Sequence, residues 1–444
     1  MSRLPRMLTA LVHNVPTACT IRKMIVLQDN RSYELCVRAL QQQGIRPLKQ
    51  VSAAHMLCCH LDRTKPIAQL LHHPRIRRIE NDIKAKIHLL SHRSVSPGHG
   101  SMLQSPLRIP WGVKAIHAPA VWSKARGQGV KVAIIDTGLS KHSDLNIAGG
   151  YNAIRRSKHY EDDNGHGTHV AGIVAAAGKA NLPYGVAPKV ELYGIKALDH
   201  NGDGYVSDIV EAVEWCIANN MNIINMSLGL DGPSHALRTS IYRAYRKGIV
   251  IVASSGNSGP HNASIDVPAI YPETIAVAAT DRQKRIPDFS SRGYGIDVSA
   301  PGDRIVSTNH LNGFSMDTGT SMAAPHVSGT IALMLSVDPQ LSPDHIREIL
   351  KETALPDHHA NIYEQGAGLI HAQAAVNRAG SHSNTWKRKR KASAIQRRPP
   401  SAYSPTQAQA SRKQSGSAAS SVHSRRLSHT ARALSQLRRG KNKR

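Results

Sequence analysis

Apolar and polar positions along the chain follow two different periods, and the changes between them mark the predicted elements. Between residues 21 and 90 the pattern predicts strand, helix, two strands, helix and strand, a βαββαβ order. From residue 109 to residue 380, apolar strand segments such as KVAIID, NIINMSL and IVIVASS alternate with amphipathic segments such as SDIVEAVEWCIANN. This alternation predicts a parallel sheet with helices on both faces. The expected fold class is α/β, preceded by a small ferredoxin-like α+β domain.

The periodic pattern stops at several places and divides the chain into five segments. Residues 1–20 are an N-terminal extension, 21–90 the small domain, and 91–108 a linker rich in Ser, Gly, Pro and His. Residues 109–380 are the large α/β domain. Residues 381–444 consist mainly of Ser, Arg, Lys, Gln and Ala, and they cannot bury enough apolar surface to offset the entropy of ordering. A disordered tail is therefore expected.

The net charge of +27 is distributed unevenly over the 444 residues. The tail, residues 381–444, holds 17 Lys or Arg and no Asp or Glu, so most of the excess charge lies there. Such a tail would attract polyanions through counterion release, without sequence specificity. Nucleic acid, anionic membrane surfaces and cell-wall polymers are all candidates, and a tail that is merely solvated is the alternative.

The five cysteines are odd in number and do not indicate a disulfide framework. No apolar run is long enough to predict a membrane span, and the broken apolar runs at the start do not resemble a secretory signal. These features predict a cytoplasmic protein, with export by a non-classical route as the alternative. Cys58 and Cys59 are neighbours in a predicted strand, so one is expected to be buried and the other exposed.

Three motifs place a reactive side chain at the end of a predicted element. Asp136 ends the strand of VAIIDTG, His166 begins a helix in DDNGHGTHVAG, and Ser321 begins a helix in GTSMAAPHVSG. Each motif also has a simpler interpretation, because Asp-Thr-Gly is a common turn and Ser often caps a helix. The second Asp-Thr-Gly copy of an aspartic protease is missing. His166 and His169 could together bind zinc, but the glutamate of HExxH and any Cys partner are absent.

The order Asp, His, Ser of these motifs resembles the subtilisin-like serine peptidases, in particular bacterial intracellular and alkaline subtilisins with an inhibitor-type pro-domain. IPWGVKAIHAPAVW, NIINMSLG and ASSGNSG extend the resemblance over residues 109–380. It implies a serine endopeptidase of broad specificity, with Ser321 as nucleophile, His166 as general base and acid, and Asp136 orienting His166. Asn257 would donate its side-chain amide to the oxyanion, alongside the backbone N–H of Ser321.

The resemblance also implies how a polypeptide substrate binds. The residues at the matching positions are Ser227, Leu228, Gly229, Val206, Ile209 and Gly256. The first three would pair with the substrate backbone as an added strand, and Gly256 would border the main specificity pocket. Val206 and Ile209 would line an apolar pocket upstream of the cleaved bond, although packing in the core of a helix explains them equally well.

The small domain resembles a subtilisin pro-domain, because IRRIENDIKAKI matches the strand that leads into the active-site cleft. The resemblance implies that this domain assists folding and inhibits the enzyme until the enzyme cuts its own chain within the linker, 91–108. An independent regulatory domain is the alternative. Protein or peptide substrates and this pro-domain are therefore the expected partners.

Catalysis of this kind needs no cofactor, and only a structural calcium ion is in question. Asp144 matches a calcium-binding aspartate of the family. However, Lys179 stands near an expected neutral ligand and Leu107 replaces an expected glutamine, whereas calcium needs several oxygen ligands. A protease fold that has lost activity and serves as a binding protein is the remaining alternative, and the complete set of catalytic residues argues against it.

Overall fold

A computed structural model describes residues 3–95, 109–179, 183–260 and 264–381, and every structural statement below refers to these residues. They belong to one compact unit. Nearly all of the predicted basic tail, most of the predicted linker and Leu107 lie outside the described residues. No helix within the described ranges is long and apolar enough to cross a bilayer.

The N-terminal domain is a small α+β unit, as predicted. Its helices and strands are α1 (Arg3–Leu11), β1 (Val12–His13), β2 (Thr20–Leu27), α2 (Asn30–Gln42), β3 (Lys49–Val51), β4 (Met56–Asp62), α3 (Ala68–Leu71) and β5 (Ile76–Asn81). The strands form one antiparallel sheet in the order β1-β4-β2-β5, with β3 also paired to β4. Helix α1 falls within the predicted extension, and its Leu4, Leu8 and Leu11 are buried in the core of this domain. The extension is therefore part of the folded unit.

Both faces of this small sheet are covered, and this makes one prediction wrong. Cys58 and Cys59 are both buried, with exposed fractions of 0% and 1%. Cys59 faces the core beneath α1 and α2, whereas Cys58 packs in a second cluster that is shared with the large domain. Alternation along β4 does point the two side chains to opposite faces, but neither face meets water. Burial raises the pKa of both thiols.

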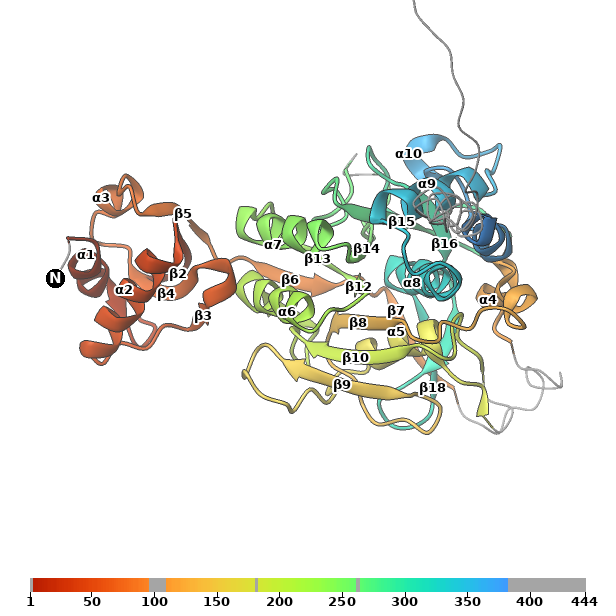
Figure 1. Ribbon diagram of the computed structural model, residues 1–444, viewed down its shortest axis with the longest axis horizontal. Helices are drawn as coiled ribbons and strands as arrows, with labels where there is room; N and C mark the ends of the chain where they lie inside the picture. The colour runs from red at the N-terminus through yellow and green to blue at the C-terminus, as the bar shows by residue number, and fades with distance from the viewer. Residues whose placement is uncertain (1–2, 96–108, 180–182, 261–263, 382–444) are drawn as a thin grey trace, which may run out of the picture. The chain divides into compact units, whose positions relative to one another are not determined.

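The large domain contains the predicted parallel sheet (Figure 1). Its strands are β8 (Lys131–Asp136), β9 (Ile147–Asn152), β10 (Glu191–Lys196), β12 (Ile223–Met226), β14 (Val250–Ser254), β15 (Thr274–Thr280) and β16 (Val298–Pro301). They are arranged in the order β16-β15-β14-β12-β8-β10-β9. The central strands are buried except at Lys131, the first residue of β8, which explains their continuous apolar runs.

Helices cover this sheet on both faces. The longer ones are α5 (His166–Ala175), α6 (Val206–Ala218), α7 (His235–Arg246), α8 (Thr320–Val337) and α9 (Pro343–Thr353), and two short ones are α4 (Trp111–Ala115) and α10 (Ile362–Gln365). Helices α5 and α8 pack into one core cluster, and α6 and α7 into another on the opposite face. The first residue of α5 and the first turn of α8 therefore lie at the edge where parallel strands end, the usual position of a site in an open α/β sheet.

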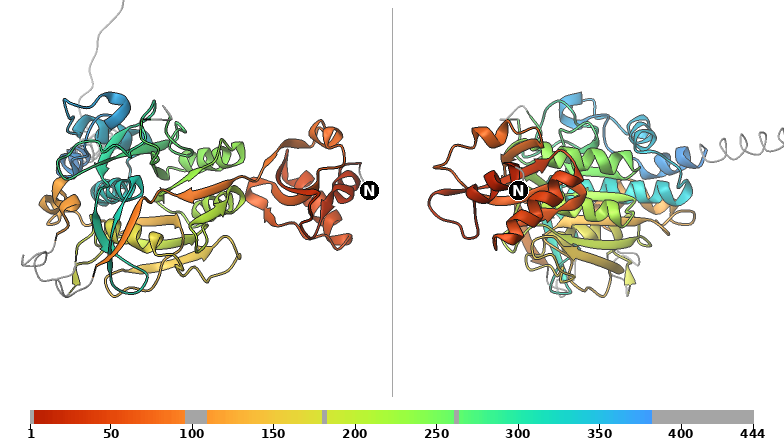
Figure 2. Two further views of the ribbon diagram at one scale, coloured as in Figure 1. Left: turned by 180° about the vertical axis from the view of Figure 1, so that it is seen from behind. Right: turned by 60° about the vertical axis from the view of Figure 1, so that its left-hand side comes forward.

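Two smaller sheets join segments that are far apart in the sequence. Their strands are β6 (Lys84–Ile87), β7 (Ser91–Val95), β11 (Asp203–Tyr205), β13 (Leu228–Leu230), β17 (Ile305–Thr308) and β18 (Phe314–Thr318). Strand β6 lies between β11 and β13, and β7 extends the pair of β17 and β18. The orange strand β6 follows the red N-terminal domain and enters the large domain (Figure 1 and the left view of Figure 2). The beginning of the predicted linker is therefore a paired strand, which its polar sequence SHRSV did not indicate.

Candidate active site

Asp136 and His166 form a hydrogen-bonded pair. Asp136 ends β8 and His166 begins α5, so each element presents its terminal side chain to the other. Oδ1 of Asp136 lies 2.7 Å from Nδ1 of His166, and neither side chain is exposed. The backbone N–H of Thr137 donates to the same oxygen at 2.7 Å. The carboxylate selects the tautomer that carries its proton on Nδ1, which leaves Nε2 free to accept one.

The charge of this pair changes the basicity of the imidazole. Burial lowers the pKa of His166, but the negative charge of Asp136 and its hydrogen bond outweigh burial, so the pKa is raised above its ordinary value of 6.5. Nε2 is buried and has no hydrogen-bond partner among the described residues. A basic, unpartnered nitrogen at a strand edge is the arrangement that a general base requires.

Asp162 fixes the loop that precedes α5, a role that the sequence did not reveal. Its Oδ1 accepts the backbone N–H groups of Asn164 and Gly165 at 3.1 and 2.8 Å. Its Oδ2 accepts the backbone N–H and the hydroxyl of Thr168 at 2.9 and 2.6 Å, and the Thr137 hydroxyl donates to Oδ1 at 2.8 Å. Asp162 therefore connects the end of β8 to the start of α5. An Asp shortly before a helix start is a capping signal, and this was available in DDNGHGTH.

Ser321 lies in the first turn of α8, directly after a Gly-Thr turn, as predicted. Its Oγ donates to the carbonyl oxygen of Ser227 at 3.1 Å, and no hydrogen bond between described atoms joins it to His166 in this conformation. In return, Oγ of Ser227 donates to the carbonyl oxygen of Ser321 at 2.9 Å. Asn225 donates to Oγ of Ser227 at 3.0 Å. This buried network ties the start of α8 to the end of β12.

Asn257 is held with its amide nitrogen facing the start of α8. Its Oδ1 accepts both the backbone N–H and the hydroxyl of Thr320 at 2.9 Å. Nδ2 is then left buried without a partner in the described part of the chain. A Cβ added to Gly319 would lie 3.0 Å from Nδ2 and would overlap the carbonyl oxygen of His88. The unpartnered Nδ2 of Asn257 and the carbonyl oxygen of His88 therefore both lie near Gly319 at the N-terminus of α8, where negative charge is favoured.

His169 does not join His166 in a zinc site. Its Nε2 hydrogen-bonds the carbonyl oxygens of Ile305 and Ser315 at 3.1 and 3.3 Å, and its Nδ1 lies 3.7 Å from Asp317. It therefore fastens α5 to β17 and β18. Within the described ranges, no group of three or more His, Cys, Asp or Glu side chains could hold a metal ion.

A strand of the chain itself occupies the predicted substrate position. β6 is antiparallel to both of its neighbours, with Lys86 opposite Gly229 on β13 and Asp203 on β11. Ile87 is opposite Leu228. Strand β6 is thus added between β11 and β13, and it is held by main-chain hydrogen bonds that do not depend on its side chains. Leu228 and Gly229 therefore lie where a polypeptide backbone binds.

The chain continues past Ser321 without a break. The His88 N–H approaches the carbonyl oxygen of Ser227 at 3.5 Å, and the Leu90 N–H donates to that of Thr318 at 2.9 Å. From Ser91 onward the chain pairs with β18. Backbone contacts therefore hold the peptide on both sides of the nucleophile position.

The side chain of His88 fills a small polar pocket. Its Nδ1 lies 2.7 Å from Oγ of Ser254, and its Nε2 lies 2.8 Å from Oδ2 of Asp266. A Cβ at Gly229 would overlap the imidazole ring, and a Cβ at Gly256 would lie 2.6 Å from Oδ2 of Asp266. Gly256 therefore borders the pocket that the residue after β6 enters.

Val206 and Ile209 are fully buried in the apolar cluster that also contains Ala85 of β6. The backbone N–H of Val206 donates to the carbonyl oxygen of Ile83 at 3.0 Å. Both residues thus pack beside the bound strand and within the core of α6. The prediction that they line a pocket for the substrate stays a prediction.

Two carboxylates of the N-terminal domain cap helices of the large domain. Asp82 accepts the backbone N–H and the hydroxyl of Ser207, near the start of α6, at 2.8 and 2.9 Å. Glu80 accepts the backbone N–H groups of His235 and Ala236, in the first turn of α7, at 3.1 and 2.8 Å. Anionic side chains are stabilising at helix N-termini, where N–H groups lack partners. These contacts dock the small domain beside the strand that it supplies.

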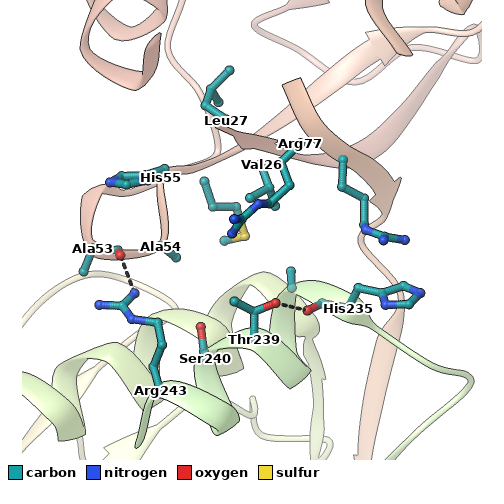
Figure 3. Close-up of a pocket in the computed structure, with 13 residues that line it drawn as sticks. Val26, Leu27, Ala53, Ala54, His55, Arg77, His235, Thr239, Ser240 and Arg243 are labelled. Carbon is teal, nitrogen blue, oxygen red and sulfur yellow. Dashed lines mark hydrogen bonds between the residues drawn. The ribbon is translucent and has the colours of Figure 1, made fainter. Parts of the chain in front are cut away.

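The same contact region also contains an open cavity. It has a volume of about 380 Å³ between the β2 and β4 region of the small domain and α7. Figure 3 shows Arg243 reaching across to the carbonyl oxygen of Ala53, with His55 and Arg77 on the opposite wall. The two domains thus meet through caps and polar bridges as well as through the shared apolar cluster that contains Cys58.

Asp144 uses both carboxylate oxygens for backbone contacts. Oδ2 accepts the N–H of Gly178 at 3.1 Å and Oδ1 accepts that of Lys179 at 2.8 Å. The ammonium group of Lys179 donates to the carbonyl oxygen of Ser143 at 3.0 Å. Donors and a cation therefore surround the carboxylate that matches a calcium ligand, and these residues do not fit a calcium ion.

Comparison with known proteins places this chemistry in a family. The model of the subtilase family matches residues 127–384. Subtilisin Savinase of Lederbergia lenta is 43% identical over 269 residues, covering 60% of this chain and 98% of that protein. Alkaline elastase YaB of Bacillus sp. (strain YaB) is 42% identical over 269 residues, 60% of this chain and 70% of that protein. Subtilisin amylosacchariticus of Bacillus subtilis subsp. amylosacchariticus is 38% identical over 342 residues, 76% of this chain and 84% of that protein. The chain therefore belongs to the subtilase family and is a serine-type endopeptidase.

Proposed function

We propose that the chain hydrolyses peptide bonds through an acyl-enzyme intermediate on Ser321, with broad specificity, and that it removes its own N-terminal domain. The observation that carries this proposal is the bound strand. β6 lies between β11 and β13 and brings the backbone of residues 88–90 to the first turn of α8. The buried Asp-His pair lies where α5 begins, at the same edge of the sheet, and the unpartnered amide of Asn257 faces the start of α8.

The chemical steps follow from these positions. In this mechanism the Ser321 side chain turns from the Ser227 carbonyl to another staggered rotamer, which brings Oγ to Nε2 of His166. Oγ attacks the peptide carbonyl while Nε2 takes its proton, and the imidazolium is stabilised by Asp136. His166 then protonates the leaving amine. Water, activated in the same way, hydrolyses the ester and regenerates the serine.

The proposed mechanism predicts that Asn257 contributes to kcat. Its Nδ2 would donate to the oxygen that becomes negative in the tetrahedral intermediate, and Thr320 fixes its orientation. Asn257→Ala is expected to lower kcat by roughly 10²–10³-fold with little change in KM. Steady-state kinetics on a chromogenic peptide would measure this, with Asn219→Ala at the end of α6 as the matched control. An equal rise in KM without loss of kcat would contradict the assignment.

The N-terminal domain acts, in this proposal, as an intramolecular inhibitor. Its strand β6 occupies the substrate position, and Asp82 and Glu80 anchor it at α6 and α7. A substrate protein cannot pair with β13 until this strand leaves. Because recognition on β6 is mainly by backbone, different sequences could replace it, and this is the basis of the proposed broad specificity.

Casein digestion and active-site labelling together test the proposed function. The purified protein should digest casein and should be labelled stoichiometrically by a phosphonyl fluoride, with the adduct located on Ser321 by peptide mass mapping. Labelling should abolish digestion. If the protein neither digests casein nor takes the label, the alternative of an inactive binding protein is favoured.

We further propose that the region around Asp144 needs no calcium. Because backbone N–H groups already occupy its carboxylate, removing divalent cations should leave the melting temperature unchanged. A site saturated at one hundred times its Kd would instead contribute about 2.7 kcal/mol to the free energy of unfolding. Melting curves of Ser321→Ala protein, which avoids self-digestion, with EDTA and with added calcium would decide. A melting temperature that falls in EDTA and returns with calcium would contradict this proposal.

A further inference from the structure

We propose that the main specificity pocket is built for a histidine side chain, with Asp266 as the residue that determines this preference, and that self-cleavage occurs between His88 and Leu89. The inference rests on the proposed function, because it names the substrate class and the bond for that same site. It is carried by the contacts of the His88 ring and by the path of the backbone around it.

The pocket presents one polar group to each ring nitrogen. Oγ of Ser254 lies 2.7 Å from Nδ1 and Oδ2 of Asp266 lies 2.8 Å from Nε2. The hydroxyl can either donate or accept, whereas the carboxylate accepts. A neutral imidazole with its proton on Nε2 and a charged imidazolium both direct an N–H toward Asp266, at ion-pair distance but without the alignment of a hydrogen bond in this conformation. The ring is almost completely enclosed, with 8% of the side chain exposed.

The walls around the ring are narrow and fixed. A Cβ at position 229 would overlap the His88 ring, and a Cβ at position 256 would clash with the Asp266 carboxylate, so glycine at both positions leaves room for the ring. The backbone of Asp266 is anchored, because its N–H donates to the carbonyl oxygen of Ser255 at 2.9 Å. The next residue, Val267, is bridged to Leu230 on β13. The backbone that carries Asp266 thus belongs to the framework of the pocket.

Other side chains would use this pocket less well. A phenylalanine ring would leave the buried Ser254 hydroxyl and the partly exposed Asp266 carboxylate without partners, and an unpaired buried polar group discriminates strongly. A lysine could reach the carboxylate, but its single nitrogen lacks the second ring nitrogen that contacts the Ser254 hydroxyl in the imidazole. An imidazole alone places nitrogen atoms at both positions.

The position of the cut follows from the occupant of the pocket. The carbonyl oxygen of His88 lies against Gly319, beside Nδ2 of Asn257, so the His88 carbonyl carbon is the one that Ser321 attacks. Leu90 is already held by Thr318 on the other side of the bond. Attack forms an ester between Ser321 and His88 and breaks the C–N bond to Leu89, whose amine takes the proton from His166. Water then releases the His88 carboxylate, leaving Leu89 as the new N-terminus.

This places the cut earlier than the linker, 91–108, in which it was expected. The strand after the bond, β7, pairs along β18 and carries the chain away from the nucleophile. His92 reinforces this pairing, with its Nδ1 2.8 Å from Asp317. Any cut within the linker would be a later trimming step.

Two measurements test the inference. The first is the N-terminal sequence of the processed wild-type protein, which should begin at Leu89. The second uses the peptides Ala-Lys-Ile-X-aminomethylcoumarin with X as His, Phe or Lys, which copy residues 85–88. The kcat/KM for His should exceed that for Phe roughly tenfold or more, the size expected when a hydrogen bond to a partly exposed charge is lost. It should also exceed that for Lys.

Variants assign the preference to its residue. Asp266→Asn keeps the size of the side chain and should reduce the His to Phe ratio of kcat/KM roughly tenfold. Glu352→Gln removes one carboxylate from the exposed face of α9 and should leave the ratio unchanged. His88→Phe should slow self-processing by a comparable factor, measured by gel during refolding. Because its substitution lies in the removed domain, its processed product should have wild-type kinetics.

The outcomes separate this inference from the proposed function. If wild-type protein cleaves neither casein nor any of the peptides, the proposed function fails. If it cleaves them but prefers Phe or Lys to His, if Asp266→Asn leaves the ratio unchanged, or if the processed chain starts elsewhere than Leu89, only the inference is overturned.

Discussion

Ser321→Ala is expected to abolish proteolysis, with kcat falling on the order of 10⁶-fold, the loss measured when a subtilisin loses its nucleophilic serine. Alanine lacks the hydroxyl that forms the ester in the proposed mechanism, and the other proposed groups only bind and polarise the peptide. The variant should also keep its N-terminal domain, because β6 and β7 stay joined through His88 and Leu89. Casein or peptide hydrolysis measures the first effect, and intact mass measures the second.

Ser336→Ala provides the matched control. Ser336 lies in the last turn of the same helix, α8, where its hydroxyl donates to the carbonyl oxygen of Leu333 at 2.8 Å. It should retain wild-type activity and should process normally. If Ser321→Ala lost activity by only a few fold, or lost its N-terminal domain at the wild-type rate, another nucleophile would have to be sought.

The sequence predicted those features that follow from local periodicity. Continuous apolar runs identified β8, β12 and β14 because central parallel strands are buried on both faces. The same runs located Asp136 at a strand end, and the apolar helices located His166 and Ser321 at helix starts. Those three positions could be predicted because the chemistry depends on where elements begin and end.

The features that were missed depend on contacts between distant segments. Asp266 is unremarkable in the sequence, and it becomes part of a pocket only because Val267 bridges to β13. His88 follows the last periodic residue of the small domain, so nothing local marks it as the occupant of that pocket. One of Cys58 and Cys59 was expected to be exposed because the sequence does not show that the large domain covers the face on which Cys58 lies.

The hydroxyl of Ser321 shows a different limit. Its sequence position predicted the correct helix turn, but the side chain hydrogen-bonds the carbonyl oxygen of Ser227 rather than His166. A rotamer is chosen by the local hydrogen-bonding partners, and one of them is the end of a strand more than ninety residues away. Sequence patterns place the backbone of a catalytic residue better than they place its reactive atom.

Asp136→Asn is expected to lower kcat roughly 10⁴-fold while substrate binding persists. The amide can donate a hydrogen bond to Nδ1 and so favours the tautomer with the proton on Nε2, which cannot accept the proton of Ser321. It also removes the negative charge that stabilises the imidazolium. Kinetics with the Ala-Lys-Ile-His peptide would measure the loss, and Asp288→Asn, which alters an exposed carboxylate, is the control. Loss of activity through KM alone would contradict an orienting role.

The pH dependence of this variant distinguishes the charge of Asp136 from its shape. In the wild type burial lowers the pKa of His166, but Asp136 outweighs it and raises the pKa above 6.5, so activity should rise with pH only above that value. Without the carboxylate, burial dominates, and the rise of the residual activity should move to lower pH.

A raised pKa of His166 in the folded state also stabilises the protein fully below the unfolded-state pKa, and this contribution is lost as the pH rises through the folded-state pKa. The free energies of unfolding of Ser321→Ala and of Ser321→Ala/Asp136→Asn should therefore differ more at pH 5 than at pH 9. A difference that grows with pH would show that Asp136 does not stabilise the charged form of His166.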